Sequence, residues 1–197
     1  MATPQVDFLK LFAELDKDVF FYLNHHRHKI LDLALPYFSD EKIIYAFFLF
    51  FGAILVSLYK WRGLIVALLT WLCVLGTDFT CGQILKPYFA RQRPLAVYEG
   101  VYCYNYQKKE WYQTTNPTKS KSYSLPSCHA ANVACAATIL AALLPRFSLL
   151  FWAFALTVAY SRIYLGVHYP FDVCFGFVLG YLIGLLGRMI TLRVLEE

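Results

Sequence analysis

Five apolar runs, separated by polar or basic segments, dominate the hydrophobic pattern of this chain. They cover residues 43–59, 64–75, 130–144, 147–160 and 173–186 and carry almost no charge. Each run is shorter than the roughly 20 residues that cross about 30 Å of hydrocarbon, so flanking polar residues must complete each crossing. Because helices satisfy their own backbone hydrogen bonds in lipid, the pattern predicts an all-α integral membrane bundle of about five transmembrane helices.

The N-terminal segment, residues 1–41, has a different pattern, in which charged positions interrupt the apolar ones. This interruption argues against a signal peptide, so we expect the segment to remain on the mature protein. The apolar positions fall opposite the charges, which predicts an amphipathic helix that lies in the membrane interface or packs against the bundle. These positions recur at helical spacing and are Phe8, Phe12, Leu15, Val19 and Leu23.

Composition supports a membrane protein, because 59% of the 197 residues are hydrophobic and only 16% are charged. Soluble domains carry about 25% charged residues. We find no internal repeat or Gly/Ser linker, so we expect one domain over residues 1–197. The one long polar stretch, residues 86–128, exceeds an ordinary connection in a compact bundle, and we interpret it as an active-site loop.

If the five predicted spans alternate in direction, residues 86–128 and 162–172 lie on the same side of the membrane. The N-terminal segment adds four basic residues to that side, and they argue against a location outside the cytoplasm for it unless the segment is a packed helix: Lys10, Lys17, Arg27 and Lys29. The opposite side receives short basic turns, which favours a cytoplasmic location for it under the positive-inside rule. We therefore expect an active site facing the periplasm or exterior of a bacterial inner membrane. The basic residues of the opposite side are Lys60, Arg62, Arg146, Arg188 and Arg193.

Two polar clusters flank the long loop. The first begins at Lys86, where the second apolar run ends, and closes with Arg93 and Pro94. The second, residues 126–129, has the sequence Pro-Ser-Cys-His directly before the third run. Ser127 is suited to cap a helix there, and the free backbone N–H groups at a helix start attract anions.

A third cluster lies between the fourth and fifth runs and joins Arg162, His168 and Asp172 within eleven positions. Pro170 suits the start of the fifth helix. Asp172 would then lie one turn inside that helix, near enough to accept the N–H of His168 and to raise the basicity of its other nitrogen.

Together the clusters predict a cradle for a tetrahedral oxyanion. His168, activated by Asp172, is placed to attack phosphorus, and His129 is placed to protonate the leaving oxygen. Phosphoryl transfer needs little beyond positioning and charge compensation. The groups that would bind the phosphate are Lys86, Arg93, Ser127, the backbone at Cys128, and Arg162.

These clusters resemble the signature of the type 2 phosphatidic acid phosphatase superfamily, which also contains vanadium haloperoxidases and glucose-6-phosphatase. Its three parts are Lys-x6-Arg-Pro, Pro-Ser-Gly-His and Ser-Arg-x5-His-x3-Asp, and the resemblance runs from about Thr77 to Gly184. It implies a phosphohistidine intermediate on His168, His129 as general acid, no metal and no cofactor. The chain departs from the pattern at Cys128, where the family has glycine, so the backbone there must suit any L-residue.

Small bacterial members of this superfamily resemble the chain most, which implies a membrane lipid phosphatase acting on a phosphate monoester or pyrophosphate. The candidate substrates are lipid A phosphate, phosphatidylglycerol phosphate, undecaprenyl pyrophosphate and phosphatidic acid, and the sequence does not rank them. An anion transporter is the alternative from another class, although a pore needs no activated histidine. Nothing indicates a nucleic-acid partner, and the oligomeric state stays open.

Several further features carry open interpretations. Asp78, inside the second run, is costly in lipid unless paired, and supporting an active-site cation is one use for it. Cys103 and Cys128 lie outside the hydrocarbon and would be free to pair in an oxidising compartment. The tract from Tyr102 to Tyr112 is either a lid over a lipid head group or an interfacial belt. The histidines at 25, 26 and 28 share no helix face, so we expect no metal there.

Overall fold

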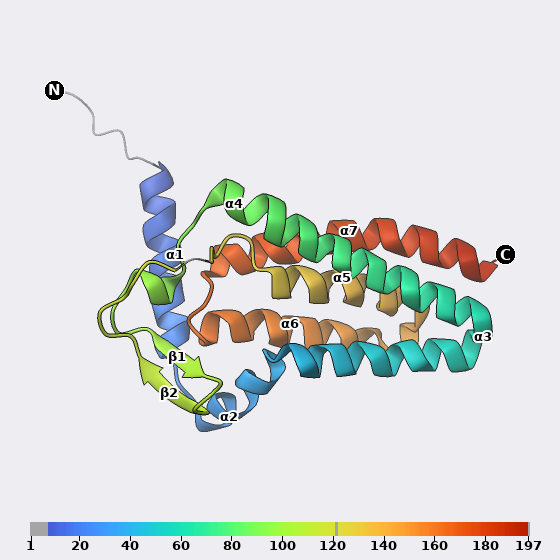
Figure 1. Ribbon diagram of the computed structural model, residues 1–197, viewed down its shortest axis with the longest axis horizontal. Helices are drawn as coiled ribbons and strands as arrows, with labels where there is room; N and C mark the ends of the chain where they lie inside the picture. The colour runs from blue at the N-terminus through green and yellow to red at the C-terminus, as the bar shows by residue number, and fades with distance from the viewer. Residues whose placement is uncertain (1–7, 121, 197) are drawn as a thin grey trace.

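The computed structural model describes residues 8–120 and 122–196. Long helices run side by side, and an N-terminal helix, a short second helix and a β-hairpin cover one end (Figure 1). The elements in chain order are α1 (Phe8–His25), α2 (Lys29–Phe38), α3 (Glu41–Phe79), η1 (Thr80–Leu85), α4 (Lys86–Phe89), η2 (Pro94–Ala96), β1 (Tyr102–Asn105), β2 (Glu110–Gln113), α5 (Cys128–Leu143), η3 (Pro145–Phe147), α6 (Ser148–Tyr164) and α7 (Pro170–Glu196).

Helix α3 doubles back on itself. Lys60 has non-helical backbone angles (φ 53°, ψ −127°), and the chain reverses there between a limb of residues 41–59 and a limb of residues 61–79 (Figure 1). The tight reversal requires glycine at position 63, because a Cβ atom there would lie 2.1 Å from the carbonyl oxygen of Leu55. The first two predicted spans are therefore the two limbs of this hairpin, and the second limb continues through the π-helical turn η1 into α4.

The helices have the length and composition of membrane spans, as predicted. Three stretches of the described chain are long and apolar enough to cross a membrane: 41–89, which contains both limbs of α3, 145–164 and 170–196. α5 is apolar but shorter. Large apolar side chains cover the outer faces of α3 and α7, as expected where a helix meets lipid. Examples are Leu49, Phe50, Leu68, Leu72, Leu182 and Leu186.

Helix α5 forms the centre of the bundle. Most of its side chains are buried, which is typical of a helix that is hydrophobic on every side. Its alanines and the glycines of α7 let these two helices approach closely. At the tightest point, a Cβ atom at Gly180 would lie 1.9 Å from the carbonyl oxygen of Ala131. The sequence of small residues thus explains why α7 packs directly against α5.

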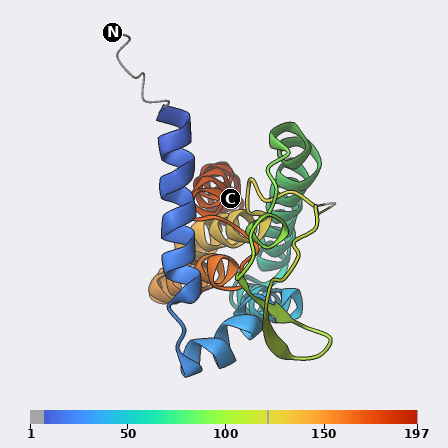
Figure 2. The same cartoon turned by 90° about the vertical axis from the view of Figure 1, so that its left-hand side faces the viewer.

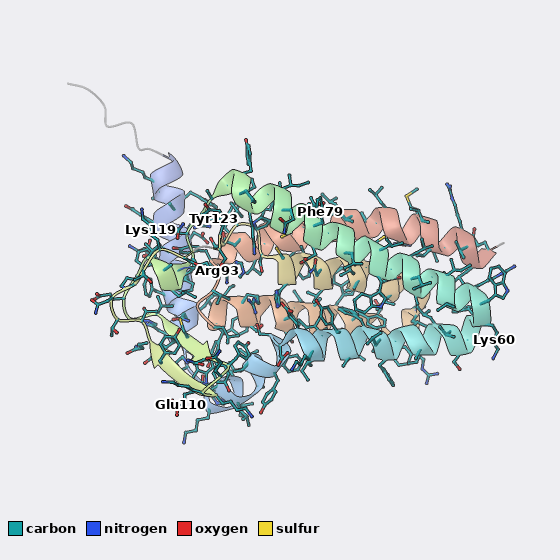
Figure 3. The ribbon with its side chains drawn as sticks, in the orientation of Figure 1. Lys60, Phe79, Arg93, Glu110, Lys119 and Tyr123 are labelled. Carbon is teal, nitrogen blue, oxygen red and sulfur yellow. The ribbon has the colours of Figure 1, made fainter. Side chains whose placement is uncertain are left out.

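The polar segments gather at one end of the bundle, as the alternation of spans predicted. Arg93, Lys119, Tyr123 and Glu110 lie at this end, whereas Lys60 lies at the other (Figure 3). The turn between α5 and α6 and the end of α7 lie with Lys60 (Figure 1). The two faces expected from the sequence are therefore the two ends of the structure.

Helix α1 lies across the polar end, along one side of the bundle axis (Figure 2). Its buried face is made by Asp16, Phe20 and Asn24 rather than by the predicted apolar stripe. On that stripe, Leu15 is 59% exposed and Val19 is 38% exposed. The amphipathic helix is thus present, but its stripe is divided: Leu15 and Val19 stay exposed, as in an interfacial helix, whereas Leu23 packs against the core and Phe12 contacts the ring of Phe171.

The β-hairpin was not predicted, since the expected fold was entirely helical. β1 and β2 pair antiparallel, with Tyr104 opposite Trp111. The Nε1 of Trp111 donates to the carbonyl oxygen of Asp32 at 3.1 Å, and the Tyr106 hydroxyl donates to that of Pro36 at 3.2 Å. Two aromatic residues of the tract therefore anchor the hairpin to α2.

Candidate active site

The connection from α6 to α7 buries His168. α6 ends where Gly166 takes a left-handed conformation (φ 76°), and a side chain there would collide with the backbone of Tyr102 in β1. The backbone N–H of His168 then donates to the carbonyl oxygen of Arg162 at 3.3 Å. His168 is only 2% exposed as a result.

Asp172, in the first turn of α7, is oriented by three interactions. Its Oδ1 accepts a hydrogen bond from Arg91 Nη1 at 2.7 Å, and its Oδ2 accepts one from the backbone N–H of Tyr169 at 2.8 Å. The Oδ2 lies 3.8 Å from Nδ1 of His168. That distance exceeds a hydrogen bond, so the direct bond expected from the spacing is not formed. The pair is placed correctly, but Arg91 is the closer partner of Asp172.

Arg91 is a residue that the sequence interpretation did not single out. Besides Asp172, it binds Asp16 of α1, with 2.6 Å between Nη2 and Oδ2, and its guanidinium stacks 3.9 Å from the ring centroid of Tyr169. Asp16 also accepts the backbone N–H of Phe171 at 2.9 Å. A carboxylate of α1 and a carboxylate of α7 are thus bridged by one cation. The available signal was that Arg91 lies inside the first cluster.

The start of α5 supplies a hydroxyl that the protein itself leaves unused. Ser127 occupies the N-cap position, but its Oγ caps nothing, contrary to the prediction. This Oγ is buried and has no partner among the described residues. The backbone N–H of Ser127 donates to the carbonyl oxygen of Asp172 at 3.0 Å, which ties the second cluster to the third. Ser127 is therefore free to bind a ligand.

Cys128 fits without strain in place of the family glycine. It is the first residue of α5 and has no positive φ. Its side chain packs with Cys81 and Ala131. Cys103 belongs to another cluster, around Phe20, and both Cys103 and Cys128 are free thiols, so they do not pair.

Three cations converge on this region without a carboxylate of their own. Within the described part of the chain, Lys86, Arg93 and Arg162 form no ion pair. The Nε atoms of Arg93 and Arg162 are buried and have no hydrogen-bond partner. Nη1 of Arg162 donates to Oγ of Ser39, at the end of α2, which orients the guanidinium. Half-buried cations that have no carboxylate partner and keep free donors are the environment that a phosphate needs.

The same charges keep His168 neutral. Burial, followed by the positive charges of Arg93, Arg162 and Lys86, holds the pKa of His168 well below its ordinary value, and a backbone hydrogen bond to Ser124 only partly opposes this. A neutral imidazole has the free lone pair that a nucleophile requires.

His129 lies near the same cations. Lys86, Arg93, Arg162 and His168 all act electrostatically on it, so the two histidines share one positive field. Its Nε2 lies 3.9 Å from Oε1 of Glu41, at the start of α3. Each histidine thus has one carboxylate near its ring, Asp172 beside His168 and the exposed Glu41 beside His129.

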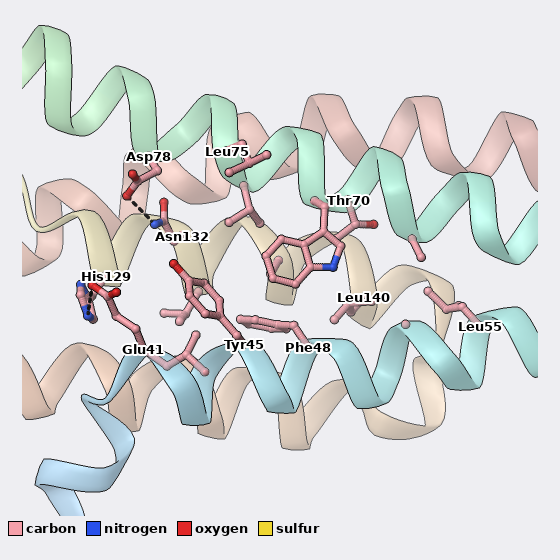
Figure 4. A pocket seen from close by; sticks show the side chains of 17 residues that line it. Glu41, Tyr45, Phe48, Leu55, Thr70, Leu75, Asp78, His129, Asn132 and Leu140 are labelled. Carbon is pink, nitrogen blue, oxygen red and sulfur yellow. Dashed lines mark hydrogen bonds and ion pairs between the residues drawn. The ribbon is translucent and has the colours of Figure 1, made fainter.

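A cavity of about 230 Å³ extends from His129 into the bundle. It lies between the two limbs of α3 and α5 (Figure 4). Its mouth is polar and its interior is apolar, so it joins the candidate site to the hydrocarbon region. The apolar lining includes Phe48, Leu55, Val74, Leu75 and Leu140.

Asp78 lies at the mouth of this cavity. Support of an active-site cation is one use that the sequence suggests for it, but the described residues show no such contact. Its Oδ1 accepts a hydrogen bond from Asn132 Nδ2 at 2.8 Å, and no described lysine or arginine forms an ion pair with it. His25 and His28 lie away from the site and bind backbone groups instead. The predicted site residues therefore converge, and the other polar features belong elsewhere.

Comparison with known proteins now identifies the family. The model of the PAP2 superfamily matches residues 61–194. The chain belongs to the PAP2 superfamily. The match covers all three polar clusters and therefore both histidines of the site, His129 and His168.

Other PAP2 proteins resemble the chain over most of its length. A lipid A 4'-phosphatase of Bacteroides thetaiotaomicron is 26% identical over 180 residues, covering 87% of this chain and 75% of that protein. The crystal structure of Aquifex aeolicus LpxE has a TM-score of 0.67 at 22% identity, covering 89% of this chain and 95% of that one.

A crystal structure of a transmembrane PAP2-type phosphatidylglycerolphosphate phosphatase from Bacillus subtilis has a TM-score of 0.65 at 22% identity, covering 96% of this chain and 89% of that one. At this identity the likeness to the two solved structures shows the fold. It confirms the predicted membrane helical bundle.

Proposed function

We propose that this PAP2 protein is a membrane phosphatase that hydrolyses a phosphate monoester or pyrophosphate on a lipid through a phosphohistidine intermediate. One observation carries the proposal. Three half-buried cations that form no ion pair among the described residues, Lys86, Arg93 and Arg162, surround a buried neutral histidine, His168. Phosphoryl transfer depends mainly on such positioning and charge compensation.

In the proposed first step, the Nε2 lone pair of His168 attacks phosphorus, because Nδ1 faces Asp172. The bond between phosphorus and the lipid oxygen breaks, and His129 gives its proton to that oxygen. Lys86, Arg93, Arg162 and the free Oγ of Ser127 bind the phosphoryl oxygens. Charge-assisted hydrogen bonds of this kind are shorter and stronger than neutral ones.

In the second step, His129 takes a proton from a water molecule, whose oxygen attacks the phosphorus of the phosphohistidine. The bond from phosphorus to nitrogen breaks, and inorganic phosphate leaves. Asp172 stabilises the positive charge that forms on His168 while the phosphoryl group is attached. The positioning of Asp172 by Arg91 thus becomes part of the mechanism.

The cavity beside His129 supports a lipid as the substrate. A phosphate bound among the cations would place its ester oxygen near His129, from which the apolar space between the limbs of α3 continues into the bundle. Candidate substrates are lipid A phosphate, phosphatidylglycerol phosphate, undecaprenyl pyrophosphate and phosphatidic acid. The lipid A 4'-phosphatase among the relatives favours the first of these.

The proposed location is a bacterial inner membrane, with the active site facing the periplasm or exterior. Its support is the short basic turn at Lys60 and Arg62, opposite the polar end. Among the basic residues of the polar end, Arg27 has a structural role, because it pairs with Asp32 at 2.5 Å and stacks on Trp111 at 3.7 Å. A reporter fused after α7 should be active as a fluorescent protein and inactive as alkaline phosphatase.

Phosphate release by the purified protein in detergent tests the activity. We expect release from at least one of the four candidate lipids, with and without EDTA, and no release by His168→Ala. A labelled phosphoenzyme should accumulate in His129→Ala when the leaving group is activated and needs no proton. Release by folded His168→Ala at the wild-type rate would refute the mechanism.

A pair of glycine variants tests the lipid path. Gly52 lines the cavity, and a Cβ atom there would meet only Ala67, at 3.8 Å. Gly52→Leu should therefore fill the cavity without disrupting the packing of the two limbs of α3. We expect it to lower activity on long-chain lipids and to spare activity on para-nitrophenyl phosphate. Gly76→Leu, on the other limb of α3 with nothing within 4 Å, is the matched control. Equal loss with both substrates would refute the path.

A further inference from the structure

The mouth of the cavity beside His129 holds more hydrogen-bond acceptors than donors. Glu41, Asp78 and Asn132 line it, and the hydroxyl of Tyr45 points towards Asn132 (Figure 4). Nδ2 of Asn132 donates to Asp78 at 2.8 Å, but Oδ1 of Asn132 is buried and has no partner in the described chain. The mechanism uses none of these acceptors.

The acceptors stand close to the place where the leaving oxygen must lie. Asn132 follows His129 by three residues on α5, so the two side chains are neighbours on one helix face, with roughly 5–6 Å between their Cβ atoms. Glu41 lies 3.9 Å from the imidazole itself. A substrate whose ester oxygen receives a proton from His129 therefore presents its next one or two carbon atoms to Asp78 and Asn132.

The chemistry of this mouth selects a kind of head group. A hydroxyl or amide N–H would satisfy Oδ1 of Asn132 and the free oxygen of Asp78. A head group without donors would leave Oδ1 of Asn132 without a partner and would remove the exposed carboxylate of Asp78 from water, which costs binding energy. Sites that hydrogen-bond a substrate hydroxyl reject analogues lacking it far more strongly than apolar pockets reject a missing methylene.

We propose that Asp78 and Asn132, with Glu41 beside them, form a specificity subsite for a hydroxyl or amide N–H on the alcohol that carries the phosphate. The subsite binds polyol or sugar head groups and disfavours alkyl and prenyl phosphates. This inference rests on the proposed function, since it concerns the same reaction.

Two lipids that differ by one hydroxyl test the subsite. Lysophosphatidic acid has a hydroxyl next to the phosphate-bearing carbon, and its 2-deoxy analogue lacks only that group. We expect the wild type to hydrolyse lysophosphatidic acid with a kcat/KM about 10- to 100-fold higher, as for a hydrogen bond to a charged or buried acceptor.

A double variant removes the subsite without leaving either residue lacking its hydrogen-bond partner. Asp78→Leu combined with Asn132→Leu replaces both members of the pair by apolar side chains of similar size, which is tolerated better than removing one. We expect it to abolish the preference by lowering kcat/KM for the hydroxyl lipid only. Glu99→Gln, an exposed carboxylate outside the cavity, should change neither value.

The outcomes separate this inference from the proposed function. Equal wild-type kcat/KM for the two lipids would overturn the subsite and leave the phosphatase activity standing. An equal loss on both lipids in the double variant would also overturn it, since that is a structural effect. Release from neither lipid, nor from the four candidate lipids, would remove the proposed function and the subsite with it.

Discussion

The bridge formed by Arg91 allows a sharp test of how the site is positioned. Arg91→Met keeps most of the side-chain volume and removes the cation shared by Asp172 and Asp16. The side chain of Asp172 is 0% exposed and that of Asp16 is 4% exposed, so both carboxylates would remain buried. Each would keep one backbone donor, from Tyr169 and Phe171 respectively.

The magnitude follows from these contacts. A hydrogen bond to a charged group contributes about 1.5–3 kcal/mol, and breaking a fully buried pair costs about 3–5 kcal/mol. The side chain of Arg91 is 25% exposed, so water would reach part of the space, and we expect a loss near 3 kcal/mol in stability. If about 2–3 kcal/mol is also lost from transition-state stabilisation, kcat/KM falls about 30- to 150-fold.

The assay combines phosphate release from detergent-solubilised lipid with thermal unfolding of the same sample. Asp16→Asn keeps Asp172 paired, and we expect a smaller loss of about 10-fold or less. Asp18→Asn, an exposed carboxylate two residues further along α1, should have no effect. If folded Arg91→Met retained the wild-type kcat/KM, Asp172 would be oriented without Arg91 and our reasoning would be wrong.

Three further predictions concern pH, packing and the departure from the family motif. Because the pKa of His168 lies well below 6.5, protonation should not inactivate it as the pH falls through 6.5. Arg93→Gln removes a positive charge that lowers this pKa, so it should move the acid limb of the kcat/KM profile to higher pH. An unmoved limb in parallel pH titrations of the two proteins would contradict this. Gly180→Ala should destabilise by about 1–3 kcal/mol, because its Cβ would meet the backbone of Ala131 at 1.9 Å, which a thermal scan against Gly76→Ala would detect. Cys128→Gly should keep kcat within roughly 3-fold, because Cys128 starts α5 without a strained backbone. Its stability cost should be up to about 1 kcal/mol, as for glycine in a helix. A large gain in kcat would show instead that the thiol hinders phosphate binding.

Sequence alone determined the parts of this protein that depend on local pattern. Apolar runs of near-membrane length predict spans wherever they occur, because the bilayer imposes the same requirement on every helix. Alternation of those spans then places residues 86–128 and 162–172 at one end, whatever the packing. Arg162, His168 and Asp172 are close in the sequence, in the connection between two helices and in the helix ends beside it. Their proximity could therefore also be predicted from the sequence.

Tertiary structure decided which groups hold the site residues in place. Asp16, Ser39 and Glu41 come from the N-terminal segment, outside the resemblance to the family, and they contact Arg91, Arg162 and His129. No periodicity announces such partners, because they are defined by distance across the fold and not along the chain. The β-hairpin shows a missed local signal, since Tyr102, Tyr104 and Tyr106 alternate as in a strand.

The distance between His168 and Asp172 also shows what the sequence determines and what the tertiary structure decides. Their spacing of four residues predicted a direct hydrogen bond, and the structure places them 3.8 Å apart. Asp172 instead bonds to Arg91 and to the backbone of Tyr169, because a buried carboxylate is most stable against the nearest cation and N–H donor. Sequence spacing determines which groups can meet, and the competition among buried partners determines which bonds form.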